Sequence, residues 1–191
     1  MNVPTIALFG TSADPPTRGH RVVLEGLLGL FPRVVTWASD NPIKRHGASL
    51  ELRCRLLGAL VEAIAEPRLR LDQELSSPWA IETLERARTR WLGHQLIFVV
   101  GSDLVPQLPS WKQSQDIFGA CDLAIAPRQG WPLLETDLGR LRDLGARLEV
   151  LPLQVPASAS SKIRARPDSD SIPQELWPVL LPHNPYGLIP S

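Results

Sequence analysis

Apolar residues follow two different periods along this chain, and the alternation predicts strands separated by helices. Short, nearly continuous apolar runs are typical of strands that are buried on both faces, as in a parallel sheet. Longer segments with apolar residues at three- and four-residue spacing are typical of the amphipathic helices that cover such a sheet. We therefore expect strands at 6–9, 34–38, 68–71, 95–100, 121–126 and 147–151.

Prolines and small polar residues mark where the intervening helices begin and end. Pro32 is expected to stop a first helix, and Ser49 is expected to cap a second. Ser77-Pro78 opens a third, because proline is tolerated in the first turn of a helix. The expected helices cover 18–31, 50–65, 79–91, one or two short pieces within 104–119, 133–144 and a short piece at 173–181.

Strands that alternate with helices at this spacing form βαβ units with right-handed crossovers. The expected fold is therefore a Rossmann-like, three-layer α/β/α domain around a central, mostly parallel sheet. A chain of 191 residues is expected to form one domain, 1–191. Within it, 1–151 is expected to be the core and 152–191 a C-terminal helical cap.

Charge and cysteine usage narrow the range of partners and compartments. Lys and Arg number 20 and Asp and Glu number 20, so the chain lacks the basic excess that nucleic-acid binding needs. No apolar run approaches the roughly 18 residues of a membrane span, and no signal-peptide pattern opens the chain. Cys54 and Cys121 are expected to be reduced core residues of a cytoplasmic protein. A homo-oligomer is compatible with the sequence, which does not decide the oligomeric state.

Residues 10–20 join the first expected strand to the first expected helix and combine small residues with prolines. A loop in this position brings backbone N–H groups and a helix N-terminus to the carboxyl edge of the sheet, where a phosphate can bind. Gly19 permits close approach, and His20 can donate a hydrogen bond to an anion. The alternative is that His20 is a surface residue of the first turn and Thr17 only its cap, although a capping hydroxyl can also face a phosphate.

Other polar clusters follow later strands, and the carboxyl ends of parallel strands share one edge of a sheet. Lys44 follows the second strand and is either a phosphate ligand or an ordinary solvated charge. Asp103 follows the fourth strand and either binds ribose hydroxyls or closes a turn. Trp111 either stacks on an aromatic ring or belongs to the core. Residues 158–164 form either a surface linker with a helix cap or an anion-binding nest.

Several well-known sites are missing from the sequence. It contains no Walker A pattern, no G-x-G-x-x-G after the first strand and no G-x-S-x-G elbow. The four histidines lack metal-ligand spacing, so no metal is expected to be held by protein side chains. A phosphate pocket without an obvious nucleophile or hydride cofactor site favours direct phosphoryl or nucleotidyl transfer, in which positioning and charge stabilisation carry the catalysis.

These segments together resemble the HxGH/TxGH nucleotidyltransferase superfamily, and particularly the bacterial nicotinate-nucleotide adenylyltransferases. The patterns of that family read roughly F-G-G-T-F-D-P-x-H/T-x-G-H, P-P-H-K, Y-T-x-D-T-L, G-x-D, W-K, R-P-G and S-x-x-I-R. The segments that match them are, in the same order, 9–20, 41–44, 79–84, 101–103, 111–112, 128–130 and 160–164.

The chain departs from the family patterns at a few of these positions. Thr11 stands in place of the second glycine, Ala13 in place of phenylalanine, Ile43 in place of histidine and Glu82 in place of aspartate. Thr17 stands in place of the first histidine, as in the TxGH branch of the superfamily.

The resemblance implies an adenylyl transfer, in which the 5′-phosphate of a pyridine mononucleotide attacks the α-phosphate of ATP and pyrophosphate leaves. Mg²⁺ accompanies the triphosphate. The implied catalytic residues are His20, Thr17, Lys44 and Arg164. The implied ATP-binding residues are Gly10, Thr11, Ser12, Gly19, His20, Gly101, Asp103, Ser160, Ser161, Ile163 and Arg164. The implied mononucleotide-binding residues are Lys44, Thr83, Trp111 and Arg128.

The sequence leaves the acceptor open. The implied partners are ATP and a pyridine mononucleotide, which is nicotinate mononucleotide or nicotinamide mononucleotide. One alternative is the same chemistry on another phosphorylated acceptor, such as phosphopantetheine, whose enzymes share the TxGH motif. The other is a nucleotide-binding regulatory module that has lost catalysis, which the substituted loop residues would suggest.

Overall fold

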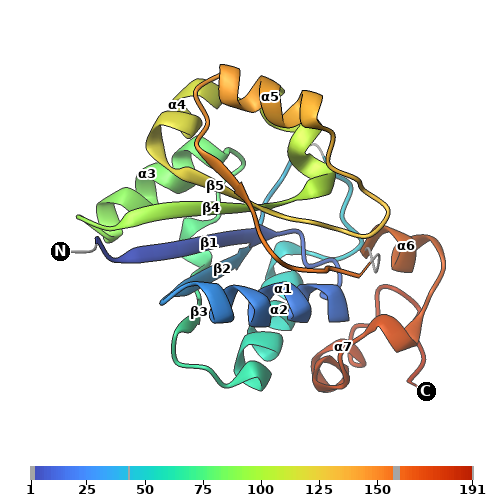
Figure 1. Ribbon diagram of the computed structural model, residues 1–191. Coiled ribbons are helices and arrows are strands. Elements are labelled where there is room, and N and C mark those ends of the chain that lie inside the picture. The colour runs from blue at the N-terminus through green and yellow to red at the C-terminus, as the bar shows by residue number, and fades with distance from the viewer. Residues whose placement is uncertain (1–2, 43, 157–159, 191) are drawn as a thin grey trace.

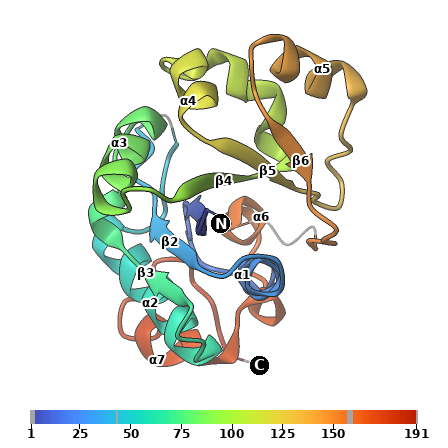
Figure 2. The same cartoon turned by 60° about the vertical axis from the view of Figure 1, so that its left-hand side comes forward.

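The computed structural model describes residues 3–42, 44–156 and 160–190, without the side chains of residues 161 and 162. Its centre is a six-stranded sheet in which each pair of neighbouring strands is parallel and the strand order is β3-β2-β1-β4-β5-β6 (Figures 1 and 2). The strands are β1 (Thr5–Thr11), β2 (Val34–Ala38), β3 (Leu69–Leu71), β4 (Gln95–Gly101), β5 (Asp122–Ala126) and β6 (Leu148–Val150). The predicted Rossmann-like α/β fold is confirmed.

Helices cover both faces of the sheet, which is why its strands are apolar throughout (Figure 1). In β1, Ala7 and Phe9 face one core, and Ile6 and Leu8 face the other. The first core lies under α1 (Arg18–Leu30), α2 (Leu50–Ile64) and α7 (Trp177–Leu180). The second lies under α3 (Ala80–Arg90), α4 (Ser114–Ala120) and α5 (Glu135–Asp143).

Shorter helical pieces complete the chain where the sequence interrupts a regular helix. The region expected to hold one or two helices at 104–119 forms a 3₁₀ segment, η2 (Ser102–Ser110), followed by α4. Pro106 and Pro109 lie inside η2, where their missing N–H groups prevent a regular α-helix. The other short pieces are η1 (Gln73–Leu75), α6 (Ser160–Ala165), η3 (Ser169–Ser171) and η4 (Gln174–Leu176). Within the described residues, no helix is both long and apolar enough to cross a membrane.

Both cysteines are free thiols in or beside the two cores. Cys121 is buried in the second core, where loss of water raises the pKa of its thiol to about 12. Cys54 is half-buried and packs against the first core. Their expected place in the packed interior is confirmed for Cys121, whereas Cys54 lies at its margin.

The sheet opens a crevice where the direction of the strand order changes. β1 pairs with β2 on one side and with β4 on the other, so the chain leaves the carboxyl ends of β1 and β4 in opposite directions. Gly10 lies at this point against the ring of Trp37. A Cβ atom on Gly10 would approach Trp37 Cζ2 to 2.5 Å, so this position has room for backbone alone.

A buried carboxylate ties the loop after β1 to two distant segments. Asp14 is completely buried, and its Oδ1 accepts hydrogen bonds from the Ala48 N–H at 3.1 Å and the Tyr186 hydroxyl at 2.7 Å. Its Oδ2 accepts from the Gly47 N–H at 2.8 Å and lies 3.2 Å from the Arg164 guanidinium. The segment that follows α6 is thereby fastened to the loop between β2 and α2 through Asp14.

Arg53 holds the backbone of the same two loops from inside α2. Its side chain is buried, and Nη1 donates to the carbonyl oxygens of Ser12 and Ser39, each at 2.8 Å. Its Nε donates to the Ala48 carbonyl at 3.3 Å. Burial lowers the pKa of Arg53, and the nearby Asp14 carboxylate acts in the opposite direction. Carbonyl groups that no strand or helix could satisfy are thus paired with one cation.

We expect Tyr186→Phe to lower the free energy of unfolding by about 1.5–3 kcal/mol, because it removes one donor from a buried carboxylate and leaves the aromatic packing in place. Urea unfolding followed by circular dichroism would measure the change. Thr36→Val is the matched control, since it removes a buried hydroxyl that donates to the neutral Phe9 carbonyl. A loss in Tyr186→Phe no larger than in this control would contradict the attachment.

Candidate active site

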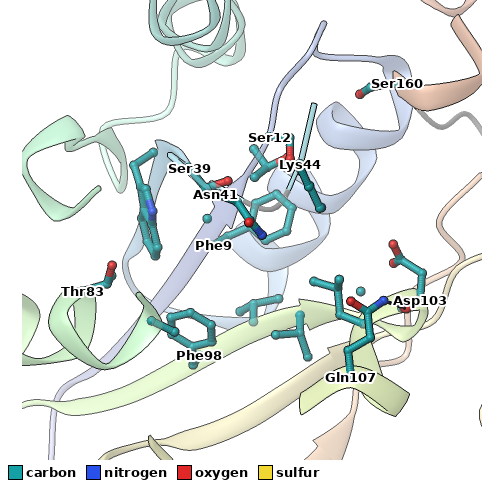
Figure 3. A pocket seen from close by; sticks show the side chains of 18 of the residues that line it. Phe9, Ser12, Ser39, Asn41, Lys44, Thr83, Phe98, Asp103, Gln107 and Ser160 are labelled. Carbon is teal, nitrogen blue, oxygen red and sulfur yellow. Dashed lines mark hydrogen bonds between the residues drawn. The ribbon is translucent and has the colours of Figure 1, made fainter. Parts of the chain in front are cut away.

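A pocket of about 740 Å³ lies at the carboxyl ends of β1, β2, β4 and β5 (Figure 3). The loops that follow these strands supply most of its lining, as the strand-end clusters of the sequence predict. Most of the predicted site residues line it, namely Gly10, Thr11, Ser12, Gly19, His20, Lys44, Thr83, Gly101, Asp103, Trp111, Arg128, Ser160 and Arg164.

Three predicted site residues lie elsewhere or outside the description. Thr17 is completely buried behind the pocket, and its hydroxyl contacts the pocket residue His20. Ile163 is buried in the first core, so the contact with ATP proposed for it stays a prediction. The side chain of Ser161 lies outside the described residues. So does all of Ile43, which is a departure from the family pattern rather than a predicted site residue.

His20 is held at both ring nitrogens by groups of the protein. Thr17 is the N-cap of α1 and forms a capping box with His20, the third residue of the helix. The Thr17 N–H donates to His20 Nδ1 at 3.0 Å, and the Thr17 hydroxyl lies 2.9 Å from the same atom. Because a backbone N–H can only donate, Nδ1 is the acceptor and Nε2 carries the proton of the neutral ring. Nε2 lies 2.8 Å from the Thr11 hydroxyl.

The surroundings of His20 keep it neutral. Loss of water, together with the positive charges of Arg128 and Lys44, lowers its pKa from 6.5 to about 3. A neutral imidazole with its proton on Nε2 is a hydrogen-bond donor at the pocket wall over the whole physiological pH range.

Positive groups gather around the loop after β1. The Lys44 ammonium lies 3.5 Å from the Ser12 hydroxyl. Although much of the Lys44 side chain is exposed, loss of water in the pocket lowers its pKa, with Asp103 acting in the opposite direction. Arg164 Nη1 donates to the Asp14 carbonyl at 2.8 Å, which fixes the guanidinium beside the same loop. These groups favour an anion at this side of the pocket.

Ser160 closes the same side of the pocket. Its hydroxyl donates to the Pro15 carbonyl at 2.8 Å, so α6 begins directly over the loop after β1. Figure 3 shows Ser160 on the same side of the pocket as Ser12 and Lys44. Two predicted segments that lie far apart in the sequence are therefore neighbours here.

Asp103 and Arg128, for which the family resemblance implies different ligands, form a pair. Arg128 Nη1 lies 3.4 Å from Asp103 Oδ2, and both side chains are partly buried. A Cβ atom on Gly101 would crowd Asp103 Oδ1, so a side chain at this position would push the carboxylate away from its place beside Arg128. Asp103 and Gln107 lie at the opposite end of the pocket from Thr83 (Figure 3).

Aromatic rings line the end of the pocket near Thr83. Phe98 lies 6.2 Å from Trp37 and 6.3 Å from Trp111 between ring centroids, the latter with the two planes at 87°. The Lys112 ammonium lies 5.0 Å from the centroid of the Trp79 ring. The Thr83 hydroxyl is turned away, donating to the Leu75 carbonyl at 2.9 Å. This end can accept a flat ring, whereas the side beside the loop after β1 attracts an anion.

Sequence reasoning missed the residues that support the site from behind. Asp14 matches a family motif, but nothing in its spacing indicates that its carboxylate would join three segments. Arg53 did carry a signal, since it lies three and four residues before Leu56 and Leu57 on the apolar face of its helix. Tyr186 carried none, because it stands in an irregular, proline-rich segment.

Comparison with known proteins assigns the chain to a family. The model of the cytidylyltransferase-like family matches residues 8–166. The chain belongs to this family. The predicted resemblance to nucleotidyltransferases is therefore confirmed.

Named relatives of this cytidylyltransferase-like protein agree with one another. It is 37% identical over 183 residues to a probable nicotinate-nucleotide adenylyltransferase of Synechocystis sp., covering 88% of this chain and 92% of that protein. It is 27% identical over 174 residues to a protein of the same name from Corynebacterium kroppenstedtii, covering 86% and 80%.

Solved structures confirm the fold of this cytidylyltransferase-like protein. Plasmodium falciparum nicotinic acid mononucleotide adenylyltransferase, complexed with NaAD, superposes with a TM-score of 0.79 at 17% identity, covering 97% of this chain and 98% of that one. The same enzyme complexed with APC superposes with a TM-score of 0.76 at 16% identity and the same coverage.

The low pKa of His20 predicts a pH dependence of stability. The pKa of His20 is about 3 in the folded chain and 6.5 in the unfolded chain. At pH values between these two, only the unfolded chain binds the proton, so the free energy of unfolding falls as the pH falls through this range. Between pH 7.5 and 5, the wild type should lose about 2 kcal/mol more than His20→Gln, whose amide can still serve the capping box. Urea unfolding at both pH values measures this difference. Equal losses in the two proteins would contradict the neutral, desolvated imidazole.

Proposed function

We propose that this protein is an adenylyltransferase that joins ATP to nicotinate mononucleotide, forming the corresponding dinucleotide and pyrophosphate. The observation that carries the proposal is a single pocket with positive groups and a neutral imidazole donor on one side and aromatic rings at one end. A pyridine mononucleotide joined to a nucleotide has complementary features, since its flat ring lies next to charged phosphates. The names of the relatives support this choice of substrates.

The acceptor mononucleotide fits the aromatic end. Its pyridine ring would lie near Trp111 and Thr83, and its 5′-phosphate would point toward Lys44. Arg128 lies within the same lining and would add positive charge toward this phosphate. In this orientation the attacking phosphate oxygen meets the loop after β1.

ATP fits the remaining part of the pocket. Its phosphates would lie against Thr11, Ser12 and Gly19, with Arg164 and Ser160 on the C-terminal side. The ribose and adenine would lie toward Gly101 and Asp103, where the carboxylate can accept hydrogen bonds from ribose hydroxyls. In this orientation, the α-phosphate of ATP would lie near His20.

The reaction needs no covalent intermediate on the protein. An oxygen of the mononucleotide phosphate attacks the α-phosphorus of ATP, and the bond to the β-phosphate oxygen breaks as pyrophosphate leaves. Negative charge shifts onto the pyrophosphate, where Lys44 and Arg164 would stabilise it, while His20 would stabilise charge on the transferred group. Catalysis then consists of positioning and charge stabilisation.

Magnesium belongs to this proposal as part of the ATP complex. Among residues 3–42, 44–156 and 160–190, no group of three His, Cys, Asp or Glu side chains is arranged to hold a metal ion. The pocket carboxylate of Asp103 is paired with Arg128. The residues described therefore do not form a metal site of their own, and Mg²⁺ would enter coordinated by the triphosphate.

Pyrophosphate release tests the proposed function. The protein is incubated with Mg²⁺-ATP and, separately, with nicotinate mononucleotide, nicotinamide mononucleotide and phosphopantetheine. We expect the highest kcat/KM with nicotinate mononucleotide. Turnover with phosphopantetheine alone would overturn the proposed acceptor. Binding of ATP without turnover of any acceptor would indicate a regulatory module instead.

His20→Ala should lower kcat by roughly 10²–10³, the loss typical of removing one donor aimed at charge in the transition state. The matched control is His183→Ala, which alters an exposed histidine outside the pocket lining and should retain the wild-type rate. Steady-state pyrophosphate release measures both rates. Near-normal turnover of a folded His20→Ala protein would contradict the role given to His20.

Trp111→Ala should raise the KM for the mononucleotide about tenfold and change the KM for ATP little, because stacking on an aromatic side chain contributes on the order of 1–3 kcal/mol per ring. Trp111→Phe keeps a ring beside Phe98 and should recover part of the affinity. Trp131→Ala is the matched control, since the Trp131 side chain is 53% exposed and lies outside the pocket lining. Equal losses of affinity for both substrates would instead indicate a packing role for Trp111.

A further inference from the structure

Thr11 places a hydroxyl group between His20 and the pocket. It is the last residue of β1, and it lines the pocket at the position where the related family pattern has glycine. Its Oγ1 lies 2.8 Å from His20 Nε2 and 3.3 Å from the backbone nitrogen of Ala13. The hydroxyl is therefore the group of the protein in contact with the proton that His20 presents.

The donors and acceptors at this hydroxyl can be counted. Thr17 occupies Nδ1 of His20, so the Nε2–H donates to Thr11 Oγ1. The Ala13 N–H donates to the same oxygen. Ala13 adopts the left-handed conformation, with φ at 47°, which bends the loop back toward Thr11. A hydroxyl oxygen has two acceptor lone pairs, and both are engaged.

Thr11 thus retains one unused hydrogen-bonding function, its own O–H. Within the described parts of the chain, no residue accepts a hydrogen bond from it. A donor whose oxygen already accepts two hydrogen bonds is polarised by them, which strengthens the bond it donates. Since Thr11 lines the pocket, the natural acceptor is an anion bound there.

We propose that the Thr11 hydroxyl is a further catalytic donor, through which His20 acts on the transferred phosphoryl group. This inference rests on the proposed nucleotidyl transfer. The hydrogen bonds run in series, from the His20 Nε2–H to Thr11 Oγ1 and from the Thr11 O–H to a phosphate oxygen. No proton is transferred along them. In a relative with glycine at this position, the same space would let the phosphate approach the imidazole directly.

The proposal predicts a distinctive order of rates for three substitutions at position 11. Thr11→Val keeps the shape but blocks the imidazole with a methyl group, so kcat should fall about 10²–10³-fold, as much as for His20→Ala. Thr11→Ser keeps the hydroxyl and should restore most of the rate. Thr11→Gly opens the direct path to His20 and should turn over at least about fivefold faster than Thr11→Val. Thr89→Val makes the same chemical change on an exposed helix position and controls for the substitution itself.

A double-mutant cycle tests whether the two groups act in series. If His20 acts through Thr11, His20→Ala should lower kcat no further in a Thr11→Val protein. Losses that multiply in the double variant would overturn the proposal. So would a Thr11→Val protein that works at the wild-type rate, or a Thr11→Gly protein slower than Thr11→Val.

A measurement without turnover separates this inference from the proposed function. In ¹⁵N-labelled protein without nucleotide, the His20 Nε2 proton should give a resonance protected from exchange with water. Thr11→Val should broaden that signal, and Thr11→Ser should keep it. A signal unaffected by Thr11→Val overturns the inference even if the enzyme is active. Absence of turnover in the wild type overturns the proposed function, and the resonance still decides whether Thr11 holds the proton of His20.

Discussion

The pocket depends on one buried negative charge, the carboxylate of Asp14. A carboxylate without access to water is tolerated only when its oxygens are fully paired, and here the partners come from two other parts of the chain. This charge would lose its partners if the segments that carry them moved apart. Those segments are the loop after β1, the turn at Gly47 and the segment bearing Arg164 and Tyr186. Three loops therefore behave as one wall of the pocket.

Arg53 complements this arrangement with the opposite charge. Its guanidinium satisfies carbonyl groups of Ser12 and Ser39, whereas Asp14 satisfies N–H groups of the neighbouring turn. Together the two side chains replace the regular hydrogen bonds that loops lack. The chemistry of the pocket then rests on groups whose own positions are fixed by neighbours, namely His20 by Thr17 and Arg164 by Asp14. Such support is what transfer by positioning requires.

Periodicity and strand-end chemistry were sufficient to predict the sheet, its helices and the edge at which the pocket lies, because both depend on local patterns. Pairings between distant side chains were not accessible in the same way. The Tyr186 hydroxyl meets an oxygen of Asp14 from 172 residues away, and a phenol in an irregular segment has no periodic neighbours that would indicate its partner. Ile163 shows the reverse case, since a position inside a binding motif turned out to contribute its side chain to the core.

The capping box at the start of α1 has a consequence for how binding energy is used. Because the Thr17 N–H fixes the imidazole as part of the first helical turn, the donor is oriented as soon as the helix forms. A nucleotide that arrives does not have to order this group, select its tautomer or remove a proton from it. The free energy of its contacts is then available for affinity and for stabilising charge, with little spent on reorganisation of the site.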